Sequence, residues 1–126
     1  MKKIENLKLL INVVISKPGL IDSAETYNAL IDTGATKSFI SEIVLNSLNL
    51  DASNFGIMTD ASNVSKKVSL YTCNVLLENH QKTIKIEVGT FIGRPECDMI
   101  IGVDIIKYGK LLVDGELFSF NINILK

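Results

Sequence analysis

Asp32 is the residue of this chain whose type and position are best suited to chemistry. It follows an apolar Ala-Leu-Ile run at positions 29–31, typical of a buried strand, and is followed at once by Thr33 and Gly34. A glycine in such a turn lets backbone approach a ligand closely. A lone carboxylate does little there, whereas two that face each other share a proton and can activate water. The chain offers one such element, so a second copy would have to supply the other carboxylate.

The other reactive side chains predict no competing site. His80 is the only histidine and lies in an expected polar turn at 78–81, where a solvated histidine is the simplest interpretation. Cys73 and Cys97 fit neither a metal-ligand spacing nor a CxxC pair, and a cysteine–histidine nucleophile has no local signature. Zinc would need all three of these residues together as ligands. The sequence therefore predicts no metal and no cofactor.

Composition bounds the class of protein. The 126 residues, 47% of them apolar, suffice for one domain over 1–126 with its own core. Thirteen Lys and Arg against 14 Asp and Glu give a net charge of -1, which favours neither a nucleic-acid partner nor an anionic membrane. No apolar run approaches the roughly 20 residues of a membrane span, and no signal peptide is expected. With only two cysteines, this favours a cytoplasmic location.

The spacing of apolar and turn-forming residues predicts mostly strands. A polar tip at 60–63 lies between two strands and predicts a long hairpin, and Asp114-Gly115 predicts a two-residue turn. At positions 39–48 apolar residues recur at helical spacing, with Ser38 as the expected N-cap. The expected strands are 7–16, 26–31, 55–59, 66–77, 83–88, 98–102, 111–113 and 118–124, and the expected helices are 39–48 and 103–108.

About eight short strands and two short helices, without a linker, predict one mainly β domain of barrel type. The last strand should turn its alternate apolar residues to one face; these are Phe118, Phe120, Ile122 and Ile124. An internal echo is also visible. An apolar strand that enters a glycine turn and then a helix occurs at Asp32-Thr33-Gly34 and again at Ile100-Ile101-Gly102.

With these motifs the sequence resembles the retroviral-type (retropepsin-like) aspartic proteases, in particular their free-standing or retrotransposon-like branch. The resemblance rests on the Asp-Thr-Gly frame at 29–36, on the Met-Ile-Ile-Gly element at 99–102, and on the hairpin between them. It covers about residues 7–124. It implies an all-β fold: a closed β-barrel with one or two short helices and a flap hairpin.

The resemblance also implies a mechanism and a set of site residues. The protein would be an aspartic endopeptidase that hydrolyses peptide bonds as a homodimer, with one catalytic Asp32 from each chain and a polypeptide in the cleft. Thr33 would form a hydrogen bond across the interface, and Gly102 would support the active-site loop. The residues implied to line the substrate are Gly34, Ala35, Thr59, Asp60, Ala61 and Ser62. Asp104 is discounted as a second catalytic carboxylate, because an acid at a helix start is explained by the helix dipole.

Two other interpretations remain open. The expected flap tip at 59–63 has no glycine, unlike the glycine-rich flaps of the viral enzymes, so a non-catalytic domain for dimerisation or for holding an extended peptide is the alternative. A small β-barrel with an incidental Asp-Thr-Gly turn is the third interpretation. Peptide turnover separates the first from the second, and monomeric behaviour at high concentration would favour the third.

Overall fold

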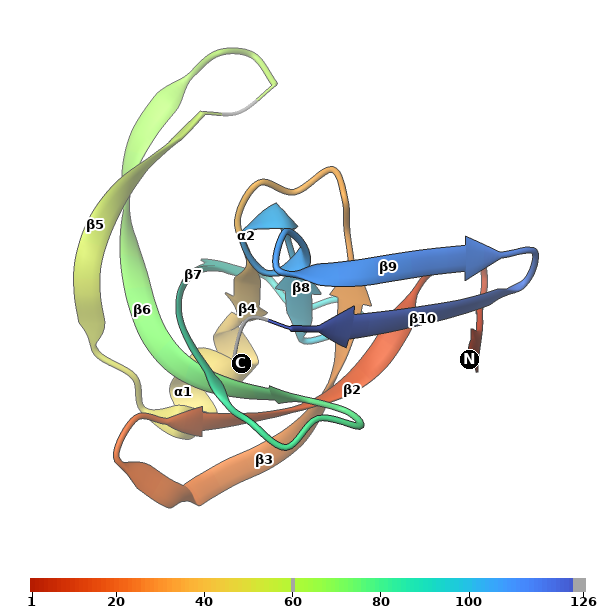
Figure 1. The fold of residues 1–126 in the computed structure, drawn as a ribbon. Helices are drawn as coiled ribbons and strands as arrows, with labels where there is room; N and C mark the ends of the chain where they lie inside the picture. Colours follow the sequence, from red (N-terminus) through yellow and green to blue (C-terminus); the bar gives the residue numbers. More distant parts are fainter. Residues whose placement is uncertain (60, 124–126) are drawn as a thin grey trace.

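The computed structural model of the chain describes residues 1–59 and 61–123. Within them, strands dominate and two short helices connect them (Figure 1). The strands are β1 (Lys2–Lys3), β2 (Leu10–Lys17), β3 (Leu20–Ile31), β4 (Phe39–Ser41), β5 (Ala52–Thr59), β6 (Ser65–Leu77), β7 (Ile84–Phe91), β8 (Met99–Ile101), β9 (Gly109–Asp114) and β10 (Leu117–Ile122). The helices are α1 (Glu42–Leu48) and α2 (Val103–Ile106). No helix of this described part is long and apolar enough to cross a bilayer.

Six strands close into a barrel. They pair in the order β2-β3-β8-β4-β7-β6, and β6 returns to pair with β2. Alternate residues of β2 and β6 point inward, so Val13, Ile15, Cys73 and Val75 are fully or almost fully buried, as period-2 strand geometry requires. The expectation of a mainly β closed barrel with two short helices is confirmed.

The β5–β6 hairpin, hereafter the flap, extends beyond the barrel (Figure 1, upper left). Only the second half of β6 belongs to the barrel. Its first half pairs with β5 alone, from Thr59 opposite Ser65 to Asn54 opposite Leu70, and Tyr71 pairs with both β5 and β7. The polar tip between these strands matches the hairpin that the sequence predicted.

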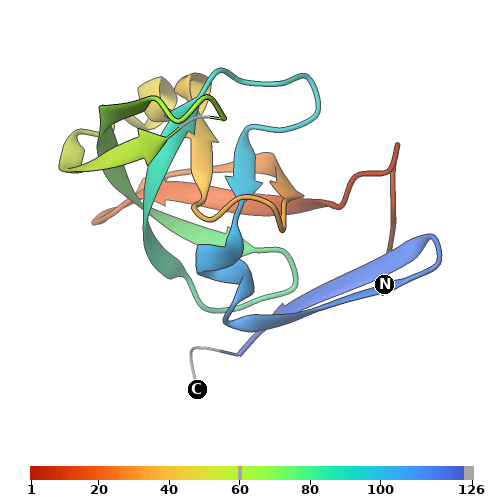
Figure 2. The same ribbon diagram turned by 90° about the horizontal axis from the view of Figure 1, so that it is seen from above.

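A second, three-stranded sheet lies across one end of the barrel, in the order β1-β10-β9 (Figure 2). Phe118 and Phe120 point from β10 into the main core, where Phe118 is completely buried. β9 pairs only with β10, and the hairpin exposes Leu112, Val113 and Leu117. The sheet therefore packs on the barrel through the face that carries Phe118. Leu112 and Leu117 lie on its opposite face, beside Ser119 and Asp114.

The expected helix at 39–48 is wrong in its first turn. Residues 39–41 form β4, which pairs in parallel with β7 and antiparallel with β8. The N-cap is Ser41, whose Oγ accepts from Val44 N–H at 3.3 Å, and not Ser38. Strand pairing inside the barrel overrides the helical spacing here, since residues at 39 and 40 suit either structure.

Smaller differences concern the ends of elements. β1 was not expected, and β2 begins at Leu10 because Asn6 and Leu7 have positive φ angles of 50° and 62°. The last hairpin turns at residues 115–116, one residue later than expected, since Asp114 pairs with Leu117. Of the face expected from the last strand, Ile124 lies outside the described residues.

Candidate active site

The loop after β3 carries Asp32, and its backbone is held on two sides. Asp32 N–H donates to the carbonyl of Ile101 at 2.9 Å, because β3 and β8 run parallel and end together. Ala35 N–H donates to the carbonyl of Asp32 at 3.1 Å and closes the turn. The half-buried Asp32 side chain therefore starts from a fixed backbone position.

The Asp32 carboxylate has one oxygen held and one open. Gly34 N–H donates to Oδ1 at 2.9 Å, an Asx-type turn within the loop. Oδ2 accepts no hydrogen bond from the residues that the structure describes. A Cβ at position 34 would lie 3.3 Å from Oδ1, and Gly34 itself is exposed. Glycine therefore leaves the carboxylate accessible from the outside of the loop.

Gly102 lies directly against the same loop. A Cβ there would stand 2.6 Å from the carbonyl oxygen of Lys37 and 2.8 Å from that of Ala35, far inside van der Waals contact. The next residue, Val103, donates its N–H to the Ala35 carbonyl at 2.8 Å. Only glycine permits this approach, because both obstacles are backbone atoms.

A buried polar pair locks the two segments together. Ser38 is fully buried; its Oγ donates to Asp104 Oδ1 at 2.7 Å and accepts from Gly102 N–H at 3.0 Å. Ser38 N–H donates to Asp104 Oδ2 at 2.9 Å. Both oxygens of Asp104 are thereby engaged. This carboxylate positions the loop and has no free oxygen for catalysis.

The remaining residues of the loop face outward to different degrees. Thr33 is exposed, and its side chain forms no hydrogen bond to the described residues. Ala35 is half-buried and packs against a small apolar cluster of Leu30, Cys97 and Ile100. The structure thus leaves the Thr33 hydroxyl available to a partner and makes Ala35 part of an apolar floor beside Asp32.

At the tip of the flap, Thr59, Ala61 and Ser62 are exposed. Thr59 Oγ1 and Ser65 Oγ lie 2.8 Å apart and hold the two strands together just before the tip. The fourth residue predicted there, Asp60, lies outside the described residues. In Figure 1 the flap and the loop that follows β3 both extend from the upper side of the barrel.

Several solved structures have a similar fold. The retropepsin-like aspartic protease from Rickettsia conorii aligns with a TM-score of 0.58 at 19% identity, over 92% of this chain and 92% of that chain. The retroviral protease-like domain of Ddi1 from Leishmania major aligns with 0.53 at 17% identity, over 92% and 90%. EIAV protease, solved with the inhibitor HBY-793, aligns with 0.50 at 22% identity, over 82% and 90%. No protein-family model and no curated protein sequence matches the chain.

The chain has a retropepsin-like fold. The fold that the sequence resemblance implied is therefore confirmed. Within this retropepsin-like fold, Asp32 follows the first strand of the parallel pair and Gly102 follows the second, so the echo seen in the sequence corresponds to two paired strand ends.

Sequence reasoning missed Ser38 as a residue of the site. Its bond to Asp104 spans 66 positions, and no local pattern marks two residues so far apart as partners. A signal was nonetheless present: a serine directly before the apolar Phe39-Ile40 pair, and an acid two residues after Gly102, could have been paired once the echo was aligned.

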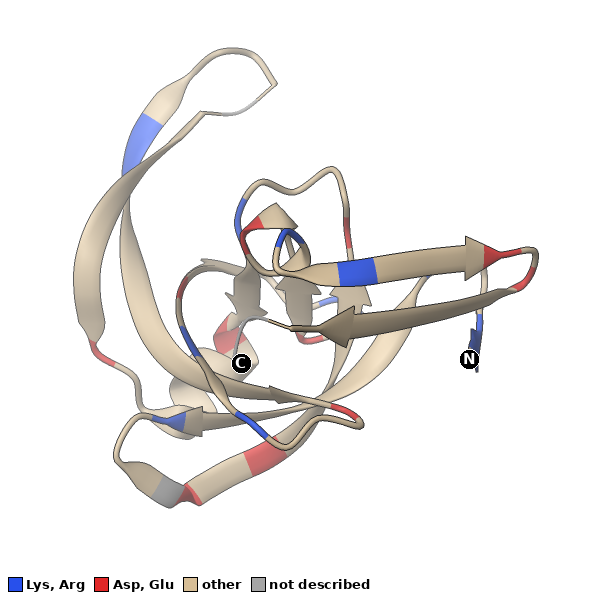
Figure 3. Cartoon of the chain, in the orientation of Figure 1, with Lys and Arg blue, Asp and Glu red and all other residues tan. Residues whose placement is uncertain are grey.

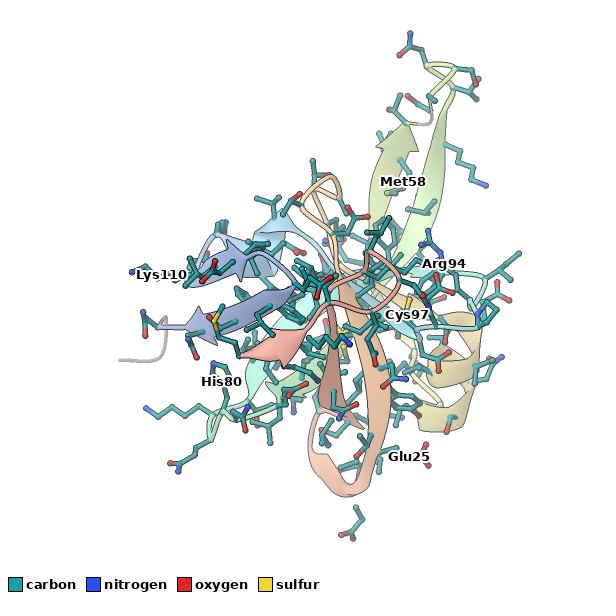
Figure 4. The ribbon with its side chains drawn as sticks, turned by 90° about the vertical axis from the view of Figure 1, so that its right-hand side faces the viewer. Glu25, Met58, His80, Arg94, Cys97 and Lys110 are labelled. Carbon is teal, nitrogen blue, oxygen red and sulfur yellow. The ribbon has the colours of Figure 1, made fainter. Side chains whose placement is uncertain are left out.

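The other reactive groups of this retropepsin-like fold are not suited to nucleophilic chemistry. Burial raises the pKa of the Cys73 thiol to about 12 and also raises the pKa of Cys97, so neither supplies a thiolate at neutral pH. His80, expected to be solvated, is half-buried: its Nε2 accepts from Ile122 N–H at 3.1 Å, and its Nδ1 lies 2.8 Å from the carbonyl oxygen of Glu78. It ties the β6–β7 turn to β10 (Figure 4).

Proposed function

We propose that this chain is an aspartic endopeptidase that works as a homodimer, each copy contributing one Asp32. The observation that supports this most directly is the Asp32 carboxylate itself: Oδ1 is oriented by Gly34 N–H, and Oδ2 is open. Its loop is braced by Gly102 and by the Ser38–Asp104 pair. The retropepsin-like fold agrees with this assignment.

A second copy is needed because the described part of one chain supplies no second free carboxylate at this loop. Asp104, two residues after Gly102, is the acid in the most comparable position at the end of β8. Both of its carboxylate oxygens accept hydrogen bonds from Ser38. In a homodimer, two Asp32 carboxylates would meet across a two-fold axis, and the exposed Thr33 hydroxyls would form hydrogen bonds across it. Such a symmetric contact joins the same surface of both copies.

The chemistry then follows from the paired carboxylates. Two carboxylates about 3 Å apart share one proton, the behaviour for which aspartic proteases are the standard example. The ionised member takes a proton from a bound water, which attacks the peptide carbonyl. The protonated member donates a hydrogen bond to the carbonyl oxygen, and the pair later gives a proton to the leaving amine. The titration belongs to the pair and not to either residue.

The β1-β10-β9 sheet is the surface that we assign to dimerisation. β9 offers an unpaired strand edge, and Leu112, Val113 and Leu117 form exposed apolar area on its hairpin. An open edge and exposed apolar residues together favour pairing with another chain. The substrate would be a polypeptide, bound in extended form under the flap tip residues Thr59, Ala61 and Ser62, with Asp60 between them. We place the activity in the cytoplasm, because both cysteines are free and buried.

The decisive experiment mixes wild-type protein with Asp32→Asn. The variant alone should cleave no peptide of a mixed library, a loss of at least about a thousandfold by analogy with other catalytic-group deletions. In mixtures at fixed total concentration, activity should fall with the square of the wild-type fraction, since a mixed dimer has one carboxylate. Asp51→Asn, at an exposed site away from the loop, is the matched control and should leave activity unchanged. Unchanged cleavage by Asp32→Asn would refute the proposal.

One sequence feature keeps a non-catalytic role as the alternative: residues 59–63 contain no glycine, so this flap differs from the viral ones that the sequence otherwise resembles. A domain that only holds an extended peptide would bind library peptides without turnover. Asp32→Asn would then bind them as tightly as the wild type does, and neither protein would cleave them.

A further inference from the structure

The inner face of the flap carries a lysine. Residues directly opposite each other in an antiparallel pair point to the same face. Met58 is opposite Lys66 and Gly56 is opposite Val68, whereas Ile57 is opposite Lys67 on the other face. The Lys67 ammonium lies 4.6 Å from the centre of the Phe55 ring, which places it on the outer face. Lys66 and Lys67 are therefore adjacent in sequence and opposite in direction.

Lys66 borders a pocket between the flap and the barrel. Lys67 also lines this pocket, but its ammonium lies over the Phe55 ring. This pocket has a volume of about 530 Å³. The flap contributes Met58 and Val68 to its wall, and the barrel contributes Phe39 and Phe91. Figure 4 shows Met58 on the flap above the segment that carries Arg94 and Cys97. The pocket is thus apolar at its floor and has Lys66 on its flap side and Glu42 at the start of α1.

The pocket floor continues to the Asp32 loop. Phe39 and Phe91 pack on the same Leu30, Cys97 and Ile100 cluster as Ala35, which lies three residues after Asp32. Gly89 permits this floor, because a Cβ there would stand 2.8 Å from the Phe39 ring. An extended peptide that passes Asp32 under the flap would therefore place side chains against this pocket.

The charge of Lys66 is not used within the described part of the chain. It forms no ion pair there, and Glu42, across the pocket, is not within 4.0 Å of it. Glu42 has a local reason to be where it is, since an acid in the first turn stabilises a helix. Figure 3 shows the blue of the adjacent lysines Lys66 and Lys67 on the β6 strand of the flap.

We propose that Lys66 makes this site select peptides with an acidic side chain under the flap, glutamate above all. This inference rests on the proposed function. A glutamate can lay its methylene groups on Val68 and Met58 and bring its carboxylate to the Lys66 ammonium. A peptide lysine at the same place would meet a like charge. The preference is an electrostatic one, so it weakens with salt.

The test uses sets of otherwise identical peptides with Glu, Gln or Lys at each position around the cleaved bond. At one position the wild type should cleave the Glu peptide about fivefold faster in kcat/KM than the Gln peptide, the effect of one partly exposed ion pair. Lys66→Met should remove the difference, and Lys66→Glu should reverse the order of the Glu and Lys peptides. Lys85→Glu, at an exposed lysine of β7 that does not line this pocket, is the matched control and should leave the order as in the wild type. Glu42→Gln should increase the preference for Glu.

Failure of this inference differs from failure of the proposed function. Cleavage that depends on Asp32 but is equal for Glu and Lys peptides overturns the role of Lys66 and leaves the proposed protease function intact. A Lys85→Glu variant that changes the order as Lys66→Glu does has the same meaning. If no peptide is cleaved, the role of Lys66 is tested by the dissociation constants of the same peptides for the Asp32→Asn protein. Tighter binding of Glu peptides that Lys66→Glu abolishes supports the role of Lys66, and equal binding overturns it.

Discussion

The ends of β3 and β8 are the two most instructive regions to compare. The strands are parallel neighbours in register, with Ile31 beside Ile101, so Asp32 and Gly102 occupy equivalent positions. After β3 the chain enters an exposed loop that presents a carboxylate. After β8 it reaches the buried Gly102, which has no side chain and lies directly against the first loop.

The difference shows that the two similar strand ends of this retropepsin-like fold have different roles: one presents a carboxylate, and the other supports the loop that carries it. The Gly102 side is filled by backbone of the Asp32 loop and closed by the Ser38–Asp104 pair. The Asp32 side is held mainly by backbone hydrogen bonds and by the bond from Gly34 N–H to Oδ1, so Oδ2 is left open. An exposed loop can keep a fixed geometry because its equivalent on the other strand is rigid, which is what a preorganised site requires.

Among the substitutions at the two strand ends, Gly102→Ala should lower the stability of the fold the most. The new Cβ would meet two backbone carbonyls at 2.6 and 2.8 Å, and neither can rotate away. We expect a loss of about 3 kcal/mol or more in the free energy of unfolding, at the upper end of overpacking effects. Urea unfolding followed by circular dichroism measures it. A variant as stable as the wild type would show that the loop is free to move.

Ser38→Ala should destabilise the packing of the Asp32 loop on Gly102 without creating a steric clash. The substitution leaves the buried Gly102 N–H without its acceptor and removes one donor from Asp104. The expected loss is about 2 kcal/mol in the free energy of unfolding. Thr36→Ala, on the exposed part of the same loop, is the control and should change stability by less than about 0.5 kcal/mol. Equal effects of the two substitutions would contradict the role given to Ser38.

Gly34→Ala tests the open side with the same chemical change as Gly102→Ala. The Cβ would lie 3.3 Å from Asp32 Oδ1 in an exposed loop, so a small adjustment relieves the contact. Stability should fall by less than about 1 kcal/mol, as is usual for exposed positions. Peptide cleavage should nevertheless fall at least about tenfold, because the methyl group crowds the carboxylate and its substrate. Thermal melts and cleavage assays on one preparation separate the two effects.

Asp32→Asn should have the smallest effect on folding. The Asn side-chain oxygen can still accept from Gly34 N–H, and no other described group depends on the charge. The free energy of unfolding of the monomer should stay within about 0.5 kcal/mol of the wild type. A larger loss would mean that the carboxylate also holds the loop, and the contrast between the open and the closed side would then be less sharp.

Much of the fold and of the candidate site could be predicted from the sequence. The features that could not be predicted depend on contacts between residues far apart in the chain. Period-2 apolar strands, the Asp-Thr-Gly frame and the glycine after Ile101 are local signals, so they predicted the barrel and drew attention to Asp32 and Gly102. The predicted helix start at Phe39 was wrong, because residues 39–41 pair with β7 and β8 and do not join the helix. The Ser38–Asp104 pair was not found because its two halves meet only when the barrel closes.

The burial of Phe118 has a consequence for how such an enzyme would be switched. This ring is completely buried in the barrel core, so the sheet that we assign to dimerisation is already complete in a single copy. Separation of two copies would leave a folded chain. The activity of such an enzyme would then depend steeply on the concentration of the folded, inactive protomer. At low concentration, doubling the amount of protomer would raise the activity about fourfold, because two protomers must meet for each active enzyme.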